Sequence, residues 1–401
     1  MANILMTWEL GGGLGHLMPM RGVGEELARR GHHVIAAVRD LSRVRSSFIN
    51  SGIDYLPAPI IARRGKPPFE KTAGFCHILS NVGFSDDSAL RTLFSAWNTL
   101  YRVVQPDLVI TDHSPTALLA MRGKPIRRVN MGLAFYCPPD MFPLPSWEKG
   151  LWADRMMKLA EDERELTHKV NTMLGEFRRP ALGRLGEIFS DVQETILATY
   201  REFDHFPDRP ASRYWGHWHA GMGAPPKWPQ GKGPKVFAYL KPSAALESLL
   251  GELKEAGVPT IVFSAEIPEP LQQRFAGDTL RFERQPLNIE RVGAECDLAI
   301  LNAGHGTTAS MLRAGKPCLL MPLYTEQLLN AQSVERMGAG RWCSSQKGSE
   351  VPPVLQDMLN SKKYREGAKA FAGRYADLIP ERQIAEVAER LEQILREPVR
   401  L

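Results

Sequence analysis

Residues 3–38 read NILMTWELGGGLGHLMPMRGVGEELARRGHHVIAAV, and their hydrophobic period changes twice. Asn3–Thr7 is a short apolar run typical of a buried strand, after which apolar residues recur at helical spacing. Pro19 suits the first turn of that helix, and Gly31 suits its end. His33–Val38 then reads as a second strand. A strand, a glycine-rich turn, a helix and a strand form a βαβ unit, which predicts a parallel sheet covered by helices.

The same alternation continues along the chain. Apolar residues at helical spacing over 90–104 predict an amphipathic helix, and Asp107–Thr111 follows it as a strand. Residues 57–87 are rich in Pro, Gly and Ser and predict a long loop, whereas residues 147–188 are mostly helical. Further strands are predicted at Lys235–Leu240, Pro259–Phe263, Leu280–Glu283, Leu298–Leu301 and Cys318–Met321, with helices at 243–256, 288–295, 306–314, 326–337 and 381–396.

The composition changes between residues 205 and 234, where proline and glycine accumulate as they do in a linker. The sequence therefore predicts two α/β lobes of similar size with a cleft between them. The N-terminal lobe would span 1–215, the linker 216–234 and the C-terminal lobe 235–380. Residues 381–401 would form a final helix.

The composition excludes several classes of protein. The 401 residues are 43% hydrophobic and 24% charged, the profile of a globular protein with a sizeable core. Five Cys without a CxxC pair give neither a disulfide framework nor a zinc knuckle, and no apolar run is long enough to span a membrane. The N-terminus resembles no secretory signal, so we expect a reducing, cytoplasmic setting. A net charge of +5 spread along the chain is not a nucleic-acid-binding signature.

The glycine-rich turn Gly11–Gly15 delivers His16 to the beginning of the first predicted helix. This turn is not the dinucleotide fingerprint GxGxxG, which needs glycine where His16 stands, and it does not end in the Gly-Lys-Ser/Thr of a P-loop. Ligands of open α/β sheets bind at the carboxyl edge of the strands, so a histidine there suits a catalytic base. A histidine that only caps or packs against the helix fits the position equally well.

A second turn, Gly304–Thr308 (GHGTT), follows another predicted strand. Its small residues let a phosphate approach the backbone, and the next helix offers free N–H groups and its positive end. A tight turn with a threonine cap is the alternative. After the following strand, Glu326 and Gln327 open a helix at the same sheet edge, where an acidic–amide pair suits vicinal sugar hydroxyls. Acidic residues are also common in any first helical turn.

These motifs together resemble a known family. Gln285–Leu287 (QPL), followed by AECDLAILNAGHGTTASMLRAGKPCLLMPLYTEQLLNA over residues 294–331, resembles the nucleotide-sugar signature of the UDP-glycosyltransferase-like family. GGGLGHLMPMRGVGEELARRGHHV over residues 11–34 is similar to the opening of that family. The resemblance thus covers most of the chain, although residues 57–90 and 147–200 match no signature of the family.

The resemblance implies the α/β fold known as GT-B, with two facing Rossmann-like parallel-sheet lobes, an interdomain cleft and a C-terminal helix that packs back on the N-terminal lobe. It implies an inverting, metal-independent glycosyltransferase without a cofactor. The donor would be a nucleotide-sugar, with UDP as the expected nucleotide, and the acceptor would be a hydroxyl of a small molecule or a lipid. A peripheral contact with a membrane stays open, because a lipid-linked acceptor would call for one.

The resemblance also implies roles for particular residues. His16 would be the general base that takes the proton of the acceptor hydroxyl, and Asp112 would orient His16 and stabilise its imidazolium. A helix cap is the alternative role for Asp112, and His113 is a second candidate base. The donor would be held at its diphosphate by Gly304, His305, Gly306, Thr307 and Thr308, at its nucleobase by Gln285 and Leu287, and at its sugar by Glu326 and Gln327.

Two positions depart from the family pattern. Asn302 stands where many members have a histidine on the diphosphate, so either Asn302 or His305 would make that contact. Ser310 stands where many members have a glutamate on the ribose, which leaves the identity of the nucleotide open. Two other functions stay as alternatives: a nucleotide-sugar epimerase or hydrolase, and a non-catalytic nucleotide-sugar-binding homologue. Aromatic residues that either line an apolar acceptor site or belong to the core are Trp97, Phe135, Tyr136, Trp147 and Trp152.

Overall fold

The computed structural model describes residues 1–42, 44–61, 65–148, 153–218 and 223–399. The chain divides into two compact units. The first unit comprises Met1–Trp218 and Pro380–Leu401, and the second comprises His219–Ile379. The predicted linker over 216–234 falls across this division, and its residues 219–222 lie outside the described part of the chain. The first unit is therefore built from two separate stretches of sequence.

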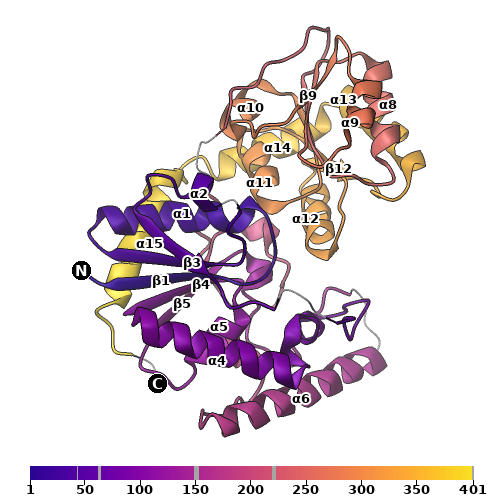
Figure 1. The fold of residues 1–401 in the computed structure, drawn as a ribbon. Coiled ribbons are helices and arrows are strands. Elements are labelled where there is room, and N and C mark those ends of the chain that lie inside the picture. Colours follow the sequence, from indigo (N-terminus) through magenta and orange to yellow (C-terminus); the bar gives the residue numbers. More distant parts are fainter. Residues whose placement is uncertain (43, 62–64, 149–152, 219–222, 400–401) are drawn as a thin grey trace. The chain divides into compact units, whose positions relative to one another are not determined.

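A parallel sheet forms the centre of the first unit (Figure 1). Its six strands follow the order β3-β2-β1-β4-β5-β6. The central strands β1 and β4 are buried along nearly their whole length, as expected for strands that are covered on both faces of a sheet. The strands are β1 (Asn3–Trp8), β2 (His33–Val38), β3 (Ile53–Pro57), β4 (Leu108–Asp112), β5 (Arg127–Gly132) and β6 (Glu194–Leu197).

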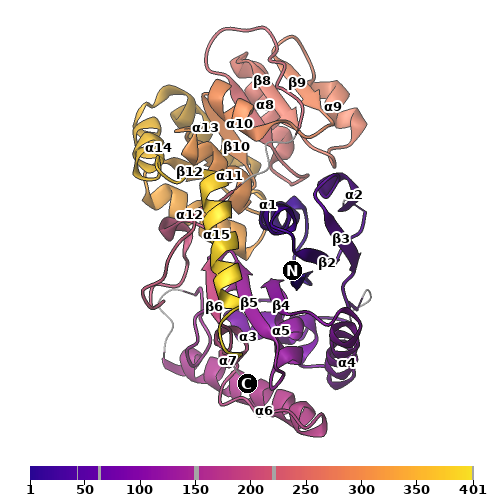
Figure 2. The same ribbon diagram turned by 90° about the vertical axis from the view of Figure 1, so that its left-hand side faces the viewer.

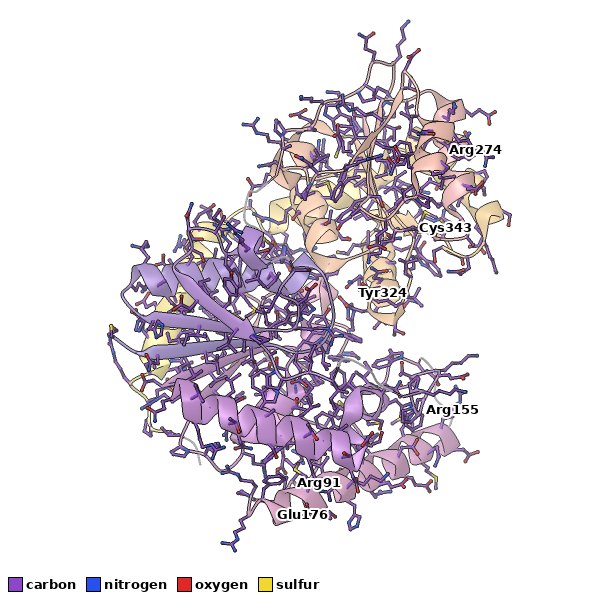
Figure 3. The ribbon with its side chains drawn as sticks, in the orientation of Figure 1. Arg91, Arg155, Glu176, Arg274, Tyr324 and Cys343 are labelled. Atoms are coloured by element: carbon purple, nitrogen blue, oxygen red, sulfur yellow. The ribbon has the colours of Figure 1, made fainter. Side chains whose placement is uncertain are left out.

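Helix α4 shows how the sequence sets the helices of this unit. The carboxylate of Asp86 accepts a hydrogen bond from the Ala89 N–H at 2.9 Å and caps the helix, whose apolar stripe is buried. On its exposed side, Arg91 binds both carboxylate oxygens of Glu176 on α6 at 2.7 Å (Figure 3). The helical segments are α1 (Leu14–Arg29), α2 (Val44–Ser47), α3 (Phe75–Leu79), η1 (Ser80–Phe84), α4 (Asp87–Val104), α5 (Pro115–Met121), η2 (Ala134–Tyr136), α6 (Ala153–Glu176), α7 (Glu187–Ser190), η3 (Arg201–Phe203) and α15 (Pro380–Ile394).

Helix α15 belongs to the first unit, where it lies beside α1 (Figure 2). Arg30, which follows α1, donates to Glu392 of α15 at 2.8 Å. Arg390 of α15 pairs with Glu194 of β6 at 2.5 Å. The buried face of α15 carries Gln383, Val387, Ala388, Leu391 and Ile394. Apolar packing and ion pairs thus attach the end of the described chain to the first sheet.

The second unit has its own six-stranded parallel sheet, in the order β12-β11-β10-β7-β8-β9. Counted within the unit, this is the strand order of the first sheet. The strands are β7 (Val236–Tyr239), β8 (Thr260–Phe263), β9 (Leu280–Glu283), β10 (Leu298–Leu301), β11 (Cys318–Leu320) and β12 (Gly340–Trp342). The helical segments are α8 (Leu246–Ala256), α9 (Glu269–Phe275), α10 (Ile289–Glu295), α11 (His305–Arg313), α12 (Thr325–Arg336), η4 (Gly348–Glu350), α13 (Val351–Asn360) and α14 (Lys363–Arg374).

Both sheets have the doubly wound order of the Rossmann fold, in which the chain direction around the sheet reverses between the first and fourth strands. That switch point lies between β1 and β4 in the first unit and between β7 and β10 in the second. Ligands of such sheets bind outside the carboxyl ends of the strands at the switch point. A ligand-binding site is therefore expected at the segments that follow β1, β4, β7 and β10.

Two details of the sequence prediction were wrong. Helix α1 begins at Leu14, so Pro19 lies inside the helix rather than in its first turn. Proline lacks the N–H that would bond to the carbonyl four residues earlier, and here that earlier residue is Gly15. The predicted loop over 57–87 contains the short helix α3 and the turn η1. Its glycine, proline and serine content concealed the helical residues Phe75–Leu79, most of which are buried.

Candidate active site

The first unit brings His16 and Asp112 together at its switch point. Asp112 is the last residue of β4, and His16 is the third residue of α1, which follows β1 through the glycine-rich turn. His16 Nδ1 lies 3.1 Å from Asp112 Oδ2, and the two side chains are 4% and 5% exposed. Because a carboxylate only accepts hydrogen bonds, Nδ1 carries the proton of this pair. His16 Nε2 is then left with a lone pair that can take up another proton.

Aromatic rings surround the His16 imidazole. The ring centroids of Trp8 and Tyr136 lie 5.2 Å and 5.0 Å from that of His16. His113 stacks on Tyr136 at 4.1 Å, and its ring centroid lies 5.9 Å from that of His16. These neighbours exclude water from the His16–Asp112 pair, which strengthens their interaction.

His113, the second candidate base, has a different environment from His16. Burial lowers the pKa of His113 well below its usual value, and the nearby His16 and Arg39 lower it further. Its backbone adopts a left-handed φ of 46°, and its carbonyl accepts the N–H of Leu10 at 3.1 Å. Neither ring nitrogen of His113 has a hydrogen-bond partner among the residues that the structure describes. His16, not His113, is therefore the imidazole that the Asp112 carboxylate contacts.

Gly11 lies against the other side of the His16 ring. A Cβ atom added to Gly11 would come within 2.4 Å of His16 Nε2. The backbone of Gly11 has a φ of 82°, which L-residues rarely adopt. The turn thus needs glycine at position 11 for two reasons. Its backbone has a positive φ, and a side chain there would collide with His16 Nε2.

In the second unit, Asn302 connects three strand ends at the switch point. Asn302 directly follows β10, and its Oδ1 accepts the backbone N–H of Lys241, which lies just beyond β7, at 2.7 Å. Its Nδ2 donates to the carbonyl of Met321, which directly follows β11, at 2.8 Å. Both ends of this buried amide therefore hold backbone groups of the protein itself.

Helix α11 begins at the next turn, with Gly304 as its N-cap and His305 as its first residue. The first turn of α11 carries no acidic residue, and the buried Thr308 Oγ1 has no hydrogen-bond partner among the described residues. The N–H groups of a first helical turn lack partners within the helix and attract an anion. Ala303 reaches this turn with a left-handed φ of 60°, and its carbonyl accepts a hydrogen bond from Asn330 Nδ2 at 3.0 Å.

The remaining predicted donor contacts follow β9 and β11, which lie on opposite sides of the switch point in the second sheet. Gln285 is exposed and Leu287 is buried in the segment after β9, which pairs with Ala224 through the N–H and carbonyl groups on either side of Leu287. Glu326 and Gln327 lie in the first turn of α12, where Gln327 Oε1 accepts the Leu323 N–H at 2.8 Å. Gln327 thus shapes the turn before α12.

The hydroxyl at the predicted ribose position is already used inside its helix. Ser310 Oγ donates to the carbonyl of Gly306 at 2.9 Å, the back-bonding common for serine within a helix. Tyr324, which precedes α12, is 57% exposed and is labelled in Figure 3. Among the described residues, no group of three or more His, Cys, Asp or Glu side chains could hold a metal ion.

Comparisons with known proteins identify relatives of the chain. Residues 255–382 match the model of the glycosyltransferase family 28 C-terminal domain. The chain is 29% identical over 316 residues to a PGL/p-HBAD biosynthesis rhamnosyltransferase of Mycobacterium bovis (strain BCG / Pasteur 1173P2), and the match covers 72% of this chain and 68% of that protein. The chain is a glycosyltransferase of the GT-B type.

Solved structures show the same fold over nearly the whole glycosyltransferase. The glycosyltransferase of kitacinnamycin superposes with a TM-score of 0.73 at 15% identity, covering 98% of this chain and 99% of that one. The glycosyltransferase VinC in complex with dTDP superposes with a TM-score of 0.68, also at 15% identity and with coverages of 98% and 99%. The fold class and the enzyme class predicted from the sequence are confirmed.

Sequence reasoning missed a buried acid, Glu9, beside the candidate site. Glu9 follows β1 and is fully buried, and its carboxylate accepts the N–H groups of Thr116 and Ala117 at 3.2 and 3.3 Å and also the Thr116 hydroxyl. These groups belong to the first turn of α5, the helix that follows Asp112. Glu9 therefore fixes the segment beyond Asp112, and no sequence motif marks its partners, which are two backbone N–H groups and the Thr116 hydroxyl.

The aromatic residues considered for the acceptor fall into different places. Phe135 and Tyr136 are both buried; the Tyr136 ring lies tilted beside His16, and Phe135 packs edge-on against Tyr136. Trp97 belongs to the core of α4, where it is fully buried. Trp147 is partly buried and donates to the Thr72 carbonyl at 2.8 Å. Trp152 lies outside the described residues.

The described helices include no candidate for a membrane-spanning segment. None of them combines the length and the apolar character needed to cross a bilayer.

Proposed function

We propose that this glycosyltransferase transfers a sugar from a nucleotide diphosphate donor to a hydroxyl of a small-molecule or lipid acceptor, with inversion and without a metal. The observation that carries the proposal is the buried hydrogen bond of 3.1 Å between His16 Nδ1 and Asp112 Oδ2 at the switch point of the first sheet. A histidine oriented by a carboxylate is the arrangement by which proteins activate a hydroxyl near neutral pH.

In the proposed reaction, the acceptor hydroxyl oxygen attacks the anomeric carbon of the donor sugar. Its proton passes to His16 Nε2, and the negative charge of Asp112 stabilises the imidazolium that forms. The bond between the anomeric carbon and the diphosphate oxygen breaks, and the nucleoside diphosphate leaves with that electron pair. A single displacement of this kind inverts the anomeric configuration.

The second unit would supply the donor contacts. The N–H groups at the beginning of α11 would hold the diphosphate and stabilise its charge as it leaves. Because both ends of the Asn302 amide are occupied by Lys241 and Met321, we assign the diphosphate contact to the turn itself rather than to Asn302. The turn comprises Gly304, His305, Gly306, Thr307 and Thr308.

The nucleobase and the sugar would bind on either side of the diphosphate. Gln285 and Leu287 follow β9 and would contact the base, partly through their backbone. Glu326 and Gln327 follow β11 and would bind the sugar hydroxyls. For Gln327 the amide NH₂ would do this, because its Oε1 already accepts the Leu323 N–H.

The nucleotide and the setting remain part of the proposal. UDP is the nucleotide that the sequence resemblance implies, whereas the structure of VinC was determined with dTDP. A relative in the comparison is named a rhamnosyltransferase of PGL/p-HBAD biosynthesis. We therefore include a deoxysugar among the donors to be tested. We also keep a peripheral membrane contact for a lipid acceptor and the cytoplasmic setting expected from the sequence.

A calorimetric titration of the purified protein with UDP, dTDP and GDP tests the donor site. We expect saturable binding of UDP in the presence of EDTA. Binding of dTDP instead would correct the nucleotide, and binding that EDTA abolishes would overturn metal independence. Failure of all three to bind would overturn the donor site.

The stereochemical course needs a separate measurement. The nucleotide that binds defines the sugar donors to be screened against phenols, sterols and polyketide alcohols. Proton NMR of the product should show the anomeric configuration opposite to that of the donor. Retention of configuration would exclude a single displacement, and donor turnover without any acceptor would favour the hydrolase or epimerase.

A further inference from the structure

The contact between Gly11 and His16 has no role in the reaction as described so far. A Cβ atom at position 11 would lie 2.4 Å from His16 Nε2 and 3.2 Å from its Cε1. Unbonded heavy atoms make their best contacts at about 3.5–4.0 Å, so a side chain of any size would have to displace the ring or the turn. The nitrogen concerned is the one that would receive the proton of the acceptor.

The surroundings of His16 leave its ring little room to yield. His16 is 3% exposed, and the ring centroids of Trp8 and Tyr136 lie 5.2 Å and 5.0 Å from that of its imidazole. A rotation that moved Nε2 away from position 11 would also move Nδ1, which is 3.1 Å from Asp112 Oδ2. Hydrogen bonds weaken steeply when they lengthen or bend, so the displaced ring would lose its orientation.

We propose that Gly11 is a positioning residue of the transfer reaction. Its missing side chain lets His16 keep Nδ1 on Asp112 while Nε2 stays where the acceptor hydroxyl must arrive. The proposal rests on the proposed role of His16 as the base. It adds that the first glycine of the turn is required by a steric contact with that base, and not only by the shape of the turn.

The turn itself offers matched controls. Gly13 has a φ of 87°, close to the 82° of Gly11, yet a Cβ atom at Gly13 would meet nothing within 4 Å. An alanine at either position would have to adopt a positive φ, which L-residues rarely do, but only the one at 11 touches His16. Gly12 has no neighbour within 4 Å of an added Cβ and is not among the residues with positive φ. The variants Gly11→Ala, Gly12→Ala and Gly13→Ala therefore separate contact from strain.

Nitrogen-15 NMR of histidine-labelled protein tests the contact without a substrate. We expect the Nδ1–H tautomer of His16 in the wild type, in Gly12→Ala and in Gly13→Ala, and a loss of that single tautomer in Gly11→Ala. The His16 signals are assigned from the His16→Ala variant. An unchanged His16 tautomer in Gly11→Ala, or an equal change in Gly13→Ala, would overturn the proposal.

Thermal melting in two backgrounds provides a second test. Gly11→Ala should lower the melting temperature by a few degrees more in the wild type than in the His16→Ala background, because His16→Ala removes the atoms with which the new Cβ collides. Gly13→Ala should lower it equally in both backgrounds. Equal losses for Gly11→Ala in both backgrounds would show that strain, not the contact with His16, is the cause.

Turnover then connects the contact to the reaction. This measurement uses the donor and acceptor that the titration and the screen proposed above would identify. Gly11→Ala should lower kcat about 100-fold with little change in the KM for the donor, because a catalytic group misplaced by about 1 Å typically loses that much activity. Gly13→Ala should lose much less. If His16→Ala leaves turnover intact, the proposed base is wrong. If His16→Ala is inactive but Gly11→Ala keeps the wild-type kcat, only the positioning role of Gly11 is refuted.

Discussion

Trp8 and Asp112 are register partners at the last shared position of the parallel strands β1 and β4. The chain that leaves Trp8 passes through the glycine-rich turn to His16, and the chain that leaves Asp112 enters α5 through His113 and Ser114. The pairing of these two strands thus brings His16 and Asp112, which are 96 positions apart in the sequence, within hydrogen-bond distance. The strand pairing fixes where the proposed catalytic pair lies.

Asp112→Asn should lower kcat by about 10²–10⁴-fold, the range that general base catalysis contributes. Asparagine is the same size, but it lacks the charge that stabilises the imidazolium, and its NH₂ group can turn toward Nδ1 and hold the wrong tautomer. The affinity for the nucleotide, measured by calorimetry, should stay unchanged. Asp107→Asn is a matched control because Asp107 precedes the same strand and accepts the Asn3 N–H at 2.8 Å. Equal kcat values for both variants would contradict the role of Asp112.

Thr307→Val should weaken binding of the nucleoside diphosphate about 5-fold to 10-fold, because a hydrogen bond of this kind contributes about 1 kcal/mol. Binding of the nucleoside without phosphates should not change. Ser310→Ala is the control in the same helix, since its hydroxyl donates to the Gly306 carbonyl. Titrations of both variants that gave the same affinity for the diphosphate would remove Thr307 from the donor site.

Glu326→Ala should weaken binding of the nucleotide-sugar more than binding of the bare nucleotide, because the proposed contacts of its carboxylate are to sugar hydroxyls. We expect a loss of about 10-fold for the sugar-nucleotide, as for removal of a charged hydrogen-bond partner. Competition between the two ligands in one titration measures this difference directly. Equal weakening of both ligands would place Glu326 away from the sugar.

Asn302→Leu should destabilise the second unit, because the Lys241 N–H and the Met321 carbonyl would both lose their partner. Each buried group left without a hydrogen bond costs about 1–3 kcal/mol. Thermal melting measures the loss, and Asn360→Leu is the control because Asn360 only donates to the Gln356 carbonyl near the exposed end of α13. An unchanged melting temperature with lost nucleotide affinity would make Asn302 a direct ligand of the diphosphate.

Glu163→Gln should change how stability depends on pH. Burial raises the pKa of Glu163 from 4.5 to about 7, although the Leu144 N–H donates to its carboxylate. Between these two values the folded protein keeps a proton that the unfolded chain releases, so stability falls as the pH rises through this window. Glutamine does not ionise and avoids the loss. The stability of Glu163→Gln relative to wild type should therefore increase from pH 5 to pH 7.5 by up to about 3 kcal/mol, and an offset that does not vary with pH would contradict the shift.

Denaturant unfolding at several pH values measures this dependence. A control is Glu161→Gln, because Glu161 is exposed on the same helix and its side chain is 60% exposed. The control should follow the wild-type pH dependence.

The sequence predicted the strands of the second unit well, with β9 and β10 at the predicted bounds. Short buried strands of a parallel sheet are almost continuously apolar and end sharply in turn residues. The strands β3, β5, β6 and β12 escaped prediction, since IDYLP, RRVNMG, ETIL and GRW mix their few apolar residues with charged or polar ones and show no clear period. The sheet pairing that recruits such segments is a long-range effect and leaves no local pattern.

The chemistry of the candidate site was easier to predict than its supporting contacts. His16 could be named from its position after a predicted strand and Asp112 from the family resemblance, although only the structure gives their distance. The bonds of Asn302 could not be foreseen, because they reach backbone groups 61 and 19 residues away. The same holds for Glu9, whose partners in α5 are 107 and 108 residues away. Nearly every residue has the same backbone N–H and C=O groups. The residue types in the sequence therefore do not show which of these groups a buried side chain will bind.

The position of α15 has a consequence for the order in which the protein folds on the ribosome. The second unit is one continuous stretch, whereas the first unit needs residues on both sides of it. At typical rates of synthesis, on the order of 10 s passes between the emergence of the first sheet and that of α15. During that time Arg30 and His32 lack the Glu392 carboxylate, and the apolar surface that α15 later covers is exposed and can bind chaperones. A nascent chain that stalled before Pro380 would contain all strands of the first sheet. It would still expose the apolar surface that α15 covers, and chaperones or proteases could recognise that surface.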